Sequence, residues 1–355
     1  MTRRQIALLA CTAAVVVSGL GATTAPSADS RTVHRVKPGE SIQKAVDAAK
    51  PGDTVLLAPG TYRESVRITT SGLTLRGSGL FPSRIEPGTA RAGDACAKAG
   101  NGICVTGTQT SPVRDVSVRS LTLHGFAKNG LWSSWTDRLK VERVVSEKNG
   151  QWGIAQEKSV RGVFRRNLAR DNGDAGLFVA NTIDQEAGAA DSKGMVISRN
   201  RLSGNRIGVT VRRLRNLTVD RNLATGNCAA VFVVGDESKP RAGDMTLHRN
   251  EIRANNKYCP KTPRLPFLQG SGIVLTGAED TKVTRNRVVD NVGTSPLSGG
   301  IVLFKSFVGA PNERNEIRDN VVLRNGSADL ANRDTGQGNT FRGNTCTLSE
   351  PAGMC

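Results

Sequence analysis

The stretch Met195–Asn227, MVISRNRLSGNRIGVTVRRLRNLTVDRNLATGN, contains nearly the same unit twice. Met195–Asn200 lines up with Leu217–Asn222. Arg201–Asn205 lines up with Asn222–Asn227 when one residue of slack is allowed. Each unit has about twenty-two residues and three short apolar runs that end at Asn or Gly. Such a repeat is typical of coils stacked into a solenoid.

The unit recurs along most of the chain as a small residue followed by an apolar-x-apolar triplet. The small residues are Gly102, Gly130, Gly153, Gly176, Gly208, Ala230, Gly272, Gly300 and, in a degenerate copy, Ala328. They follow one another at intervals of 22 to 42 residues, which indicates a coil of fixed length with loop insertions. We expect the insertions at 181–194, 235–243, 254–270, 291–299 and 306–315.

A second and a third apolar run follow each triplet, and an Asn recurs after the second run. These residues are Asn167, Asn200, Asn222, Asn250, Asn286, Asn320 and Asn344. In coils stacked in parallel at about 4.8 Å they would form a ladder in which each amide bonds the next. The pattern predicts an all-β fold, a parallel β-helix with three strands per coil and about nine to ten coils.

The N-terminal part predicts a cap on this solenoid. A strand at 32–37 precedes Ser41, an expected N-cap, and a helix with one apolar face from Ile42 to Ala49. Lys50-Pro51-Gly52 then ends the helix. We expect 29–355 to form one domain, with the cap and first coil at 32–70, further coils at 72–345 and a closed end at 346–355.

Residues 1–28 are typical of a cleaved secretory signal peptide. Arg3 and Arg4 precede an apolar stretch from Ile6 to Leu20, and small residues follow it, with cleavage expected after Ala25 or Ala28. No later stretch has the roughly twenty apolar residues of a membrane span. The sequence therefore predicts a secreted protein with no transmembrane anchor, and we expect a monomer.

The 355 residues have a formal net charge of +18 and only 4% aromatic residues. Such a charge either serves solubility or attracts an anionic partner. We expect an acidic polysaccharide or a cell-wall polymer. No module that combines aromatic and basic residues supports specific nucleic acid binding.

Six cysteines follow the predicted signal peptide, and an even number in an exported chain indicates disulfides with fifteen possible connectivities. Pairing between sequence neighbours is the simplest of them: Cys96–Cys104, Cys228–Cys259 and Cys346–Cys355. A zinc site is not expected, because the chain has no C-x-x-C and only three His.

The repeats, together with the opening VKPGESIQKAVDAAKPGDTVLLAPGTYRE at 36–64, resemble the right-handed parallel β-helix proteins of the pectate-lyase-like superfamily. The opening is similar to the cap of bacterial secreted members, among them periplasmic copper-pathway proteins of the NosD kind. The resemblance covers nearly all of the chain after residue 28. It implies the fold strongly and an activity only weakly.

By this resemblance the substrate groove lies on the face formed by the triplets. If the flanking apolar residues point inward, the middle ones point outward. These are Trp132, Ala155, Phe178, Thr210, Phe232, Val274 and Val302. Trp132, Phe178 and Phe232 would then form a platform for sugar rings, or the loops at 181–194 and 254–270 fold over this face and bury them.

A lyase acting on uronic acids needs a cation that neutralises the carboxylate and a base, often Arg or Lys in this superfamily. Arg212 or Lys305 is the candidate base, and Asn181 and Arg213 are candidate substrate-binding residues. A Ca²⁺ ion would be held by Asp184, Glu186, Asp191 and Asp236, unless these carboxylates pair with nearby Arg.

Motifs of polygalacturonases and mannuronan epimerases are absent, and Met and His are too scarce for a copper site of soft ligands. Two functions remain: an enzyme on acidic polysaccharide, with a lyase as the leading reaction, and a non-catalytic wall- or glycan-binding protein.

Overall fold

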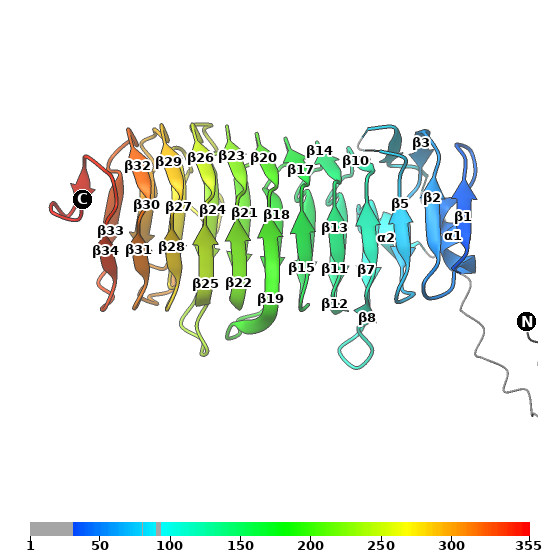
Figure 1. Cartoon of the computed structure of the whole chain (residues 1–355), viewed down its shortest axis with the longest axis horizontal. Helices are drawn as coiled ribbons and strands as arrows, with labels where there is room; N and C mark the ends of the chain where they lie inside the picture. Colours follow the sequence, from blue (N-terminus) through cyan, green and yellow to red (C-terminus); the bar gives the residue numbers. More distant parts are fainter. Residues whose placement is uncertain (1–30, 80, 90–93) are drawn as a thin grey trace, which may run out of the picture. The chain divides into compact units, whose positions relative to one another are not determined.

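The computed structural model describes residues 31–79, 81–89 and 94–355, so the predicted signal peptide lies outside the described residues. Successive short strands wind into coils that stack along one axis (Figure 1). The strands form three long parallel sheets, here named A, B and C, because each coil contributes one strand to each sheet. The main chain thus adopts the three-stranded parallel solenoid that the repeat predicts.

Sheet A has twelve strands. They are β1 (Val33–Val36), β2 (Thr54–Leu57), β5 (Thr74–Arg76), β9 (Ser117–Arg119), β13 (Lys140–Glu142), β16 (Val163–Arg165), β19 (Ala190–Ser198), β22 (Leu214–Asp220), β25 (Gly243–His248), β28 (Lys282–Thr284), β31 (Glu316–Arg318) and β34 (Thr340–Arg342).

Sheet B has ten strands. They are β3 (Gly60–Arg63), β6 (Ser83–Glu86), β10 (Thr122–His124), β14 (Val145–Glu147), β17 (Leu168–Arg170), β20 (Arg201–Ser203), β23 (Leu223–Thr225), β26 (Glu251–Arg253), β29 (Arg287–Val289) and β32 (Val321–Leu323).

Sheet C contains the triplets. Its strands are β4 (Val66–Ile68), β7 (Ile103–Thr106), β11 (Leu131–Ser134), β15 (Ile154–Glu157), β18 (Ala175–Ala180), β21 (Ile207–Arg212), β24 (Ala229–Val234), β27 (Ser271–Thr276), β30 (Gly299–Phe304), β33 (Leu330–Arg333) and β35 (Ser349–Glu350). Two short strands, β8 (Val113–Arg114) and β12 (Thr136–Asp137), pair beside the sheets.

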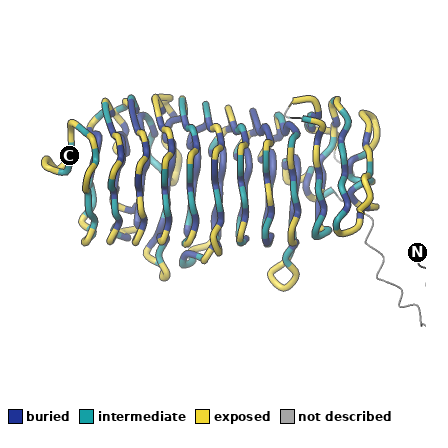
Figure 2. Tube along the Cα trace, in the orientation of Figure 1, coloured by how far each residue is buried: buried dark blue, intermediate teal, exposed yellow. Residues whose placement is uncertain are grey.

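The apolar core runs along the inside of the coils, where Figure 2 shows buried residues recurring in every coil. The register between β20 and β23 pairs Leu202 with Ala224, an offset of 22 residues. The same offset joins Met195 to Leu217. The two copies in the opening stretch therefore superpose without the expected slack.

The seven predicted asparagines are bonded to one another through the turns from sheet A to sheet B. Each Nδ2 donates to Oδ1 of the Asn in the next coil over 2.9–3.1 Å, from Asn167 through to Asn344. The same Oδ1 accepts the backbone N–H of the preceding Asn, as Asn222 does for Asn200. The amides thus satisfy backbone donors that have no strand partner.

A second ladder, for which the sequence analysis named no residues, occupies the turns from sheet B to sheet C. It consists of Asn149, Asn172, Asn205, Asn227, Asn255, Asn291 and Asn325. The Asp329 carboxylate ends this ladder, because its Oδ1 accepts both the backbone N–H and Nδ2 of Asn325.

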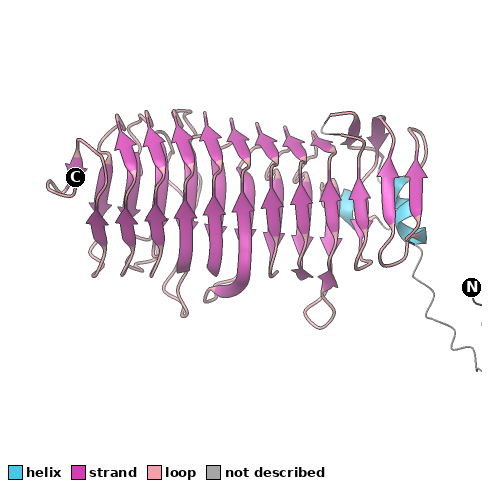
Figure 3. Cartoon of the chain, viewed as in Figure 1, coloured by secondary structure: helices cyan, strands magenta, loops and turns pink. Residues whose placement is uncertain are grey.

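Both helices lie near the N-terminal end of the stack, α1 (Ile42–Ala48) and α2 (Ala95–Lys98) (Figure 3). The Ser41 hydroxyl accepts the Lys44 N–H, and Ile42 and Val46 are buried. This is the N-cap and the apolar face that the sequence predicts. No helix in the described part is both long and apolar enough to cross a membrane.

Three disulfides join Cys96 to Cys104, Cys228 to Cys259, and Cys346 to Cys355. These are the pairings between sequence neighbours that we expect. Disulfides form and persist in oxidising compartments, so they indicate a location outside the cytoplasm.

Candidate functional site

The outer face of sheet C is covered over its C-terminal half. The middle residues of the triplets lie in register, with Phe178 beside Thr210 and Thr210 beside Phe232. They point outward as predicted, yet Phe232, Val274 and Val302 are each no more than 1% exposed. They belong to a second apolar cluster, separate from the core, that includes Leu268 and Leu297 from the insertions. Here the loops bury the predicted platform.

Nearer the N-terminus three aromatic rings form a continuous stack. Trp152 lies between Trp132 and Phe178, with ring centroids 6.1 Å and 4.1 Å apart and interplanar angles of 18° and 11°. Trp152 precedes a triplet, so the triplet rule does not find it. The middle residue of its own coil is Ala155, which pairs with Trp132 and Phe178 on either side. The small Ala155 side chain leaves room for the indole ring between its neighbours.

A cavity of about 920 Å³ opens on this face beside the ring stack. Its floor comes from β18, β21 and β24, and its walls come from four insertions, 181–194, 235–243, 254–270 and 306–315. The lining includes Trp152, Asp174, Phe178, Asp184, Glu186, Arg206, Thr210, Arg212, Arg213, Phe232, Asp236, Arg264 and Phe307. Its size and its mixture of aromatic and charged groups fit a sugar-sized ligand.

Arg213 is a structural anchor rather than an open substrate contact. Its side chain is buried and forms ion pairs with Asp236 and, over 3.2 Å, with Glu186. It also donates to Thr182 Oγ1 and to the Gln185 carbonyl. These bonds fix the loop after β18 against the end of β21. The prediction of Arg213 as a substrate-binding residue is therefore not supported by its surroundings.

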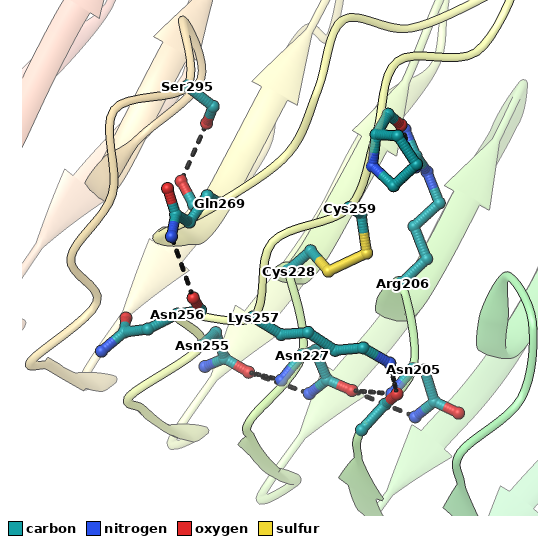
Figure 4. The surroundings of a disulfide bond; sticks show 12 residues. Asn205, Arg206, Asn227, Cys228, Asn255, Asn256, Lys257, Cys259, Gln269 and Ser295 are labelled. Carbon is teal, nitrogen blue, oxygen red and sulfur yellow. Dashed lines mark hydrogen bonds between the residues drawn. A yellow bond between two sulfur atoms is a disulfide. The ribbon is translucent and has the colours of Figure 1, made fainter.

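Arg206, which the sequence analysis did not single out, holds the cavity wall formed by the insertion 254–270. It donates to the Pro260 carbonyl over 2.6 Å and to the Pro266 carbonyl over 3.3 Å. The Cys228–Cys259 disulfide ties the same loop to the start of β24 (Figure 4). The insertions 181–194 and 254–270 are thus both held by guanidinium-to-carbonyl bonds.

Arg212 differs from these two guanidiniums. It is partly buried, and its side chain donates to the Ile183 carbonyl over 3.0 Å. Within the described residues it forms no ion pair with a carboxylate. Burial lowers the pKa of Arg212, and the neighbouring charges of Arg213 and Arg264 lower it further. Its remaining N–H donors are left for a ligand in the cavity.

Thr210, the neighbour of Arg212 on β21, places an unsatisfied hydroxyl on the same floor. It is 6% exposed, and its Oγ1 has no hydrogen-bond partner. A buried hydroxyl without a partner costs about 1–3 kcal/mol. A ligand oxygen or a water in the cavity would satisfy it.

Asp174 lies at the other side of the cavity, where its Oδ2 accepts the Trp152 indole N–H over 2.9 Å. Burial raises the pKa of Asp174, against the lowering effects of this hydrogen bond and of the Arg206 charge. Its carboxyl therefore stays protonated to a higher pH than an ordinary Asp does.

Asp174→Asn is expected to raise the free energy of unfolding at pH 7. Because the folded-state pKa lies above the unfolded value of about 3.9, stability is lost as pH rises between the two values. The advantage of the variant should therefore vanish below about pH 3.9 and grow above it. Urea unfolding across a pH series would measure it, with the exposed Asp244→Asn as control. A difference between Asp174→Asn and wild type that does not change with pH would contradict the argument.

The four predicted Ca²⁺ ligands do not converge. Glu186 and Asp236 both pair with Arg213, and Asp184 is exposed at the cavity wall. Asp191 lies outside the cavity lining and accepts from Asn216 and from the Lys193 N–H. The described residues contain no group of three His, Cys, Asp or Glu that could hold a metal ion. Arg213 thus pairs with two of the four carboxylates that the prediction assigned to calcium.

Three further predicted site residues also lie outside the cavity lining. Lys305 is exposed just after β30, so of the two candidate bases the cavity contains Arg212. Asn181 donates to the Gly188 carbonyl and thereby closes its own loop. Trp132 stacks on Trp152 at the end of the ring stack.

Two family models match the chain. One, described as right handed beta helix region, matches residues 94–252, and another, described as periplasmic copper-binding protein (NosD), matches residues 179–350. No curated protein sequence matches the chain.

Similar solved structures include several carbohydrate-active proteins. The A-module of Azotobacter vinelandii mannuronan C-5 epimerase AlgE4 is 19% identical, with a TM-score of 0.58, coverage of 87% of this chain and 90% of that chain. DFA-IIIase from Arthrobacter chlorophenolicus A6 in complex with GF2 is 14% identical, with a TM-score of 0.62 and coverage of 89% and 88%. Such identities establish a common fold and no common activity.

The residues of this chain do not fit a copper site of the kind that the second family model names. All six described cysteines are in disulfides. His34, His124 and His248 lie apart, bonded to Asp53, Glu147 and Thr284 respectively. Met195 and Met245 are buried in the core. Copper prefers thiolate, thioether or imidazole groups that meet at one point. The described residues contain no group of three His, Cys, Asp or Glu that could hold a metal ion, and Met354 packs against the core.

The three parallel sheets, the matched family models and the similar structures agree with one another. The chain folds as a right-handed parallel β-helix, in which residues 94–252 match the right handed beta helix region and residues 179–350 match the NosD model.

Proposed function

We propose that the cavity on sheet C binds one unit of an acidic polysaccharide. The observation that supports this most is Arg212, a partly buried guanidinium in the cavity with no carboxylate partner among the described residues. Removing a cation from water without a counter-charge is costly. A carboxylate of the ligand, lying between Arg212 and Arg264, supplies that counter-charge through bidentate bonds.

The neighbouring groups match a sugar ring. Phe178 and Trp152 contribute apolar atoms to the cavity lining, against which C–H groups of a pyranose pack. The unsatisfied Thr210 hydroxyl bonds to a ring hydroxyl or to the carboxylate. Apolar surface together with a few polar groups is the usual composition of a specific small-ligand site.

The reaction that we propose for this site is β-elimination. A base removes the proton at C5 of a uronate unit, the electron pair forms the C4=C5 double bond, and the C4–O bond breaks. The leaving oxygen takes a proton. Burial and the neighbouring charges lower the pKa of Arg212 and so raise the fraction of Arg212 in the neutral guanidine form. In that form Arg212 accepts the C5 proton and becomes a guanidinium, while the charged Arg264 holds the carboxylate. Water in the cavity supplies a proton for the leaving oxygen.

Non-catalytic binding by the same cavity is the second candidate. It is favoured by the bonds that tie down Arg206, Arg213 and Asp236, because these groups hold the loops in place. We also propose that the chain is secreted after removal of 1–28, which the three disulfides support.

The two candidates separate in one assay. The protein is incubated with pectate, alginate and glycosaminoglycans, with and without Ca²⁺, and the absorbance of unsaturated products is followed. Calorimetric titration with the same glycans and with a neutral glucan measures binding. A lyase gives rising absorbance with at least one acidic glycan. Constant absorbance together with salt-sensitive binding of acidic glycans would support the non-catalytic function. Equal affinity for the neutral glucan and the acidic glycans would contradict both candidate functions.

A further inference from the structure

A row of arginines lies on the turns from sheet A to sheet B, away from the cavity on sheet C. In Figure 1 the sheet A strands lie below the sheet B strands, so these turns follow one another along the stack. In six successive coils the residue two positions before the sheet B strand is an exposed arginine. We name Arg143, Arg166, Arg199, Arg221, Arg249 and Arg285 the arginine row.

The six residues are stacked in register. The backbone N–H of each arginine donates to a carbonyl in the next coil over 3.0–3.3 Å. The accepting residue is the one that precedes the corresponding turn position, as Ser198 precedes Arg199 and accepts from Arg166. Adjacent coils are about 4.8 Å apart, so the six guanidiniums span roughly 24 Å along the axis. This spacing places like charges side by side within the Debye length, which is unfavourable without a counter-charge.

The backbone of the turn does not require arginine. All six residues have positive φ, between 51° and 57°. Gly, Asn and Asp adopt this conformation more readily than a long side chain does. The same turn position is Asp319 and Gly343 in later coils, which shows that small or polar residues form the turn as well.

The row also lacks the ionic partners that arginines have elsewhere on the surface. Arg138 pairs with Asp115, and Arg161 pairs with Asp137 in the preceding coil. Within the row Arg221 pairs with Asp220, whereas the other five form no ion pair with any described residue. Their charges therefore serve no salt bridge within the described chain.

A surface cavity of about 460 Å³ lies at the N-terminal end of the row. Four guanidinium-bearing residues line it, Arg76, Arg119, Arg143 and Arg166, together with serines and Glu142. None of these four arginines forms an ion pair in the described part of the chain. The lining contains no aromatic side chain.

We propose that the arginine row and this cavity bind a single-chain acidic polysaccharide along the solenoid edge. The partner presents a line of carboxylates, one on each sugar, to a line of guanidiniums, one on each coil. Each guanidinium forms bidentate bonds to a carboxylate. A single-stranded nucleic acid is a poorer match, since sites for it combine cations with aromatic rings that stack on bases. This surface shares no residue with the Arg212 cavity and does not depend on the proposed function.

The test replaces three unpaired members of the row, Arg166→Asn, Arg199→Asn and Arg249→Asn, in one protein. Asn tolerates positive φ, so the variant should fold at least as stably as the wild type. The control replaces Lys98, Lys193 and Arg253, which are exposed, by Asn and has the same net charge. Affinity for polygalacturonate, a neutral glucan and single-stranded DNA of similar length is measured from 50 to 200 mM salt.

The row variant should bind polygalacturonate about tenfold more weakly than the wild type, and the control should change by less than about threefold. The slope of log affinity against log salt should fall by up to about 2 in the row variant. Equal losses of polygalacturonate affinity in the row variant and in the control would show that net charge alone sets the affinity. That result would overturn the proposal. Tighter wild-type binding to DNA than to polygalacturonate would overturn the assigned partner. The three row substitutions should cause the same fold-loss of polygalacturonate affinity in an Arg212→Ala background as in the wild type, which separates the two surfaces.

Discussion

Arg212→Ala is expected to weaken binding of acidic glycans to the cavity by roughly tenfold to a hundredfold. A hydrogen bond between charged groups contributes about 1.5–3 kcal/mol, and the alanine removes it together with the counter-charge of the ligand carboxylate. If Arg212 also accepts the C5 proton, turnover falls by about 10²–10⁴. Calorimetric titration and the absorbance assay measure the two effects separately.

Two controls make this result specific. Arg212→Lys keeps a positive charge but loses the planar fork, so it should restore part of the binding and little of the turnover. Arg253→Ala removes an exposed positive charge on β26, outside the cavity, and should change neither quantity. Urea unfolding of each variant checks that the bond from Arg212 to the Ile183 carbonyl is not needed for folding. Wild-type affinity in Arg212→Ala would refute the proposed site.

Asn222→Ala is expected to lower the free energy of unfolding by about 3–5 kcal/mol. The Asn222 Oδ1 accepts both the backbone N–H and Nδ2 of Asn200, and its Nδ2 donates to the Ile197 carbonyl. The alanine leaves these buried groups without partners, and each unsatisfied group costs about 1–3 kcal/mol. The midpoint of urea unfolding measures the loss.

Asn344→Ala provides the matched comparison, because Asn344 accepts and donates the same three bonds at the end of the same ladder. Asn344 is only partly buried, so water replaces the missing partners. We expect a loss of about 1–2 kcal/mol. Equal losses for Asn222→Ala and Asn344→Ala would show that burial of the ladder does not set its contribution.

The repeat in Met195–Asn227 was sufficient to predict the sheets, the core and the first ladder. A period of about twenty-two residues and the Asn after the second apolar run are local features, which parallel stacking repeats in every coil. The second ladder had the same signal, since Asn205 and Asn227 are 22 residues apart. This signal is weaker than that of the first ladder, because the third apolar run ends at either Asn or Gly.

The residues of the cavity were harder to predict, because they depend on where the insertions fold. Arg213 and Asp236 are distant in sequence from each other, and their ion pair gives Asp236 a partner that the sequence pattern did not indicate. Trp152 lies outside the triplets and reaches the face only because Ala155 is small. These arrangements depend on contacts between the coils and the inserted loops. The loops are not part of the sequence repeat, so the repeat does not predict those contacts.

By itself the sequence determined the solenoid and the first ladder, because both follow from short-range patterns that the stack repeats. The cap followed from local helix signals, and the disulfide pairing was the simplest of the fifteen that the sequence allowed. Tertiary structure alone decided which charges are neutralised and which are left open. Arg206 and Arg213 hold the loops, whereas Arg212 and most of the arginine row have no carboxylate partner within the described chain. The physical reason is that the charge state of a surface depends on distances between side chains from different coils, which folding sets.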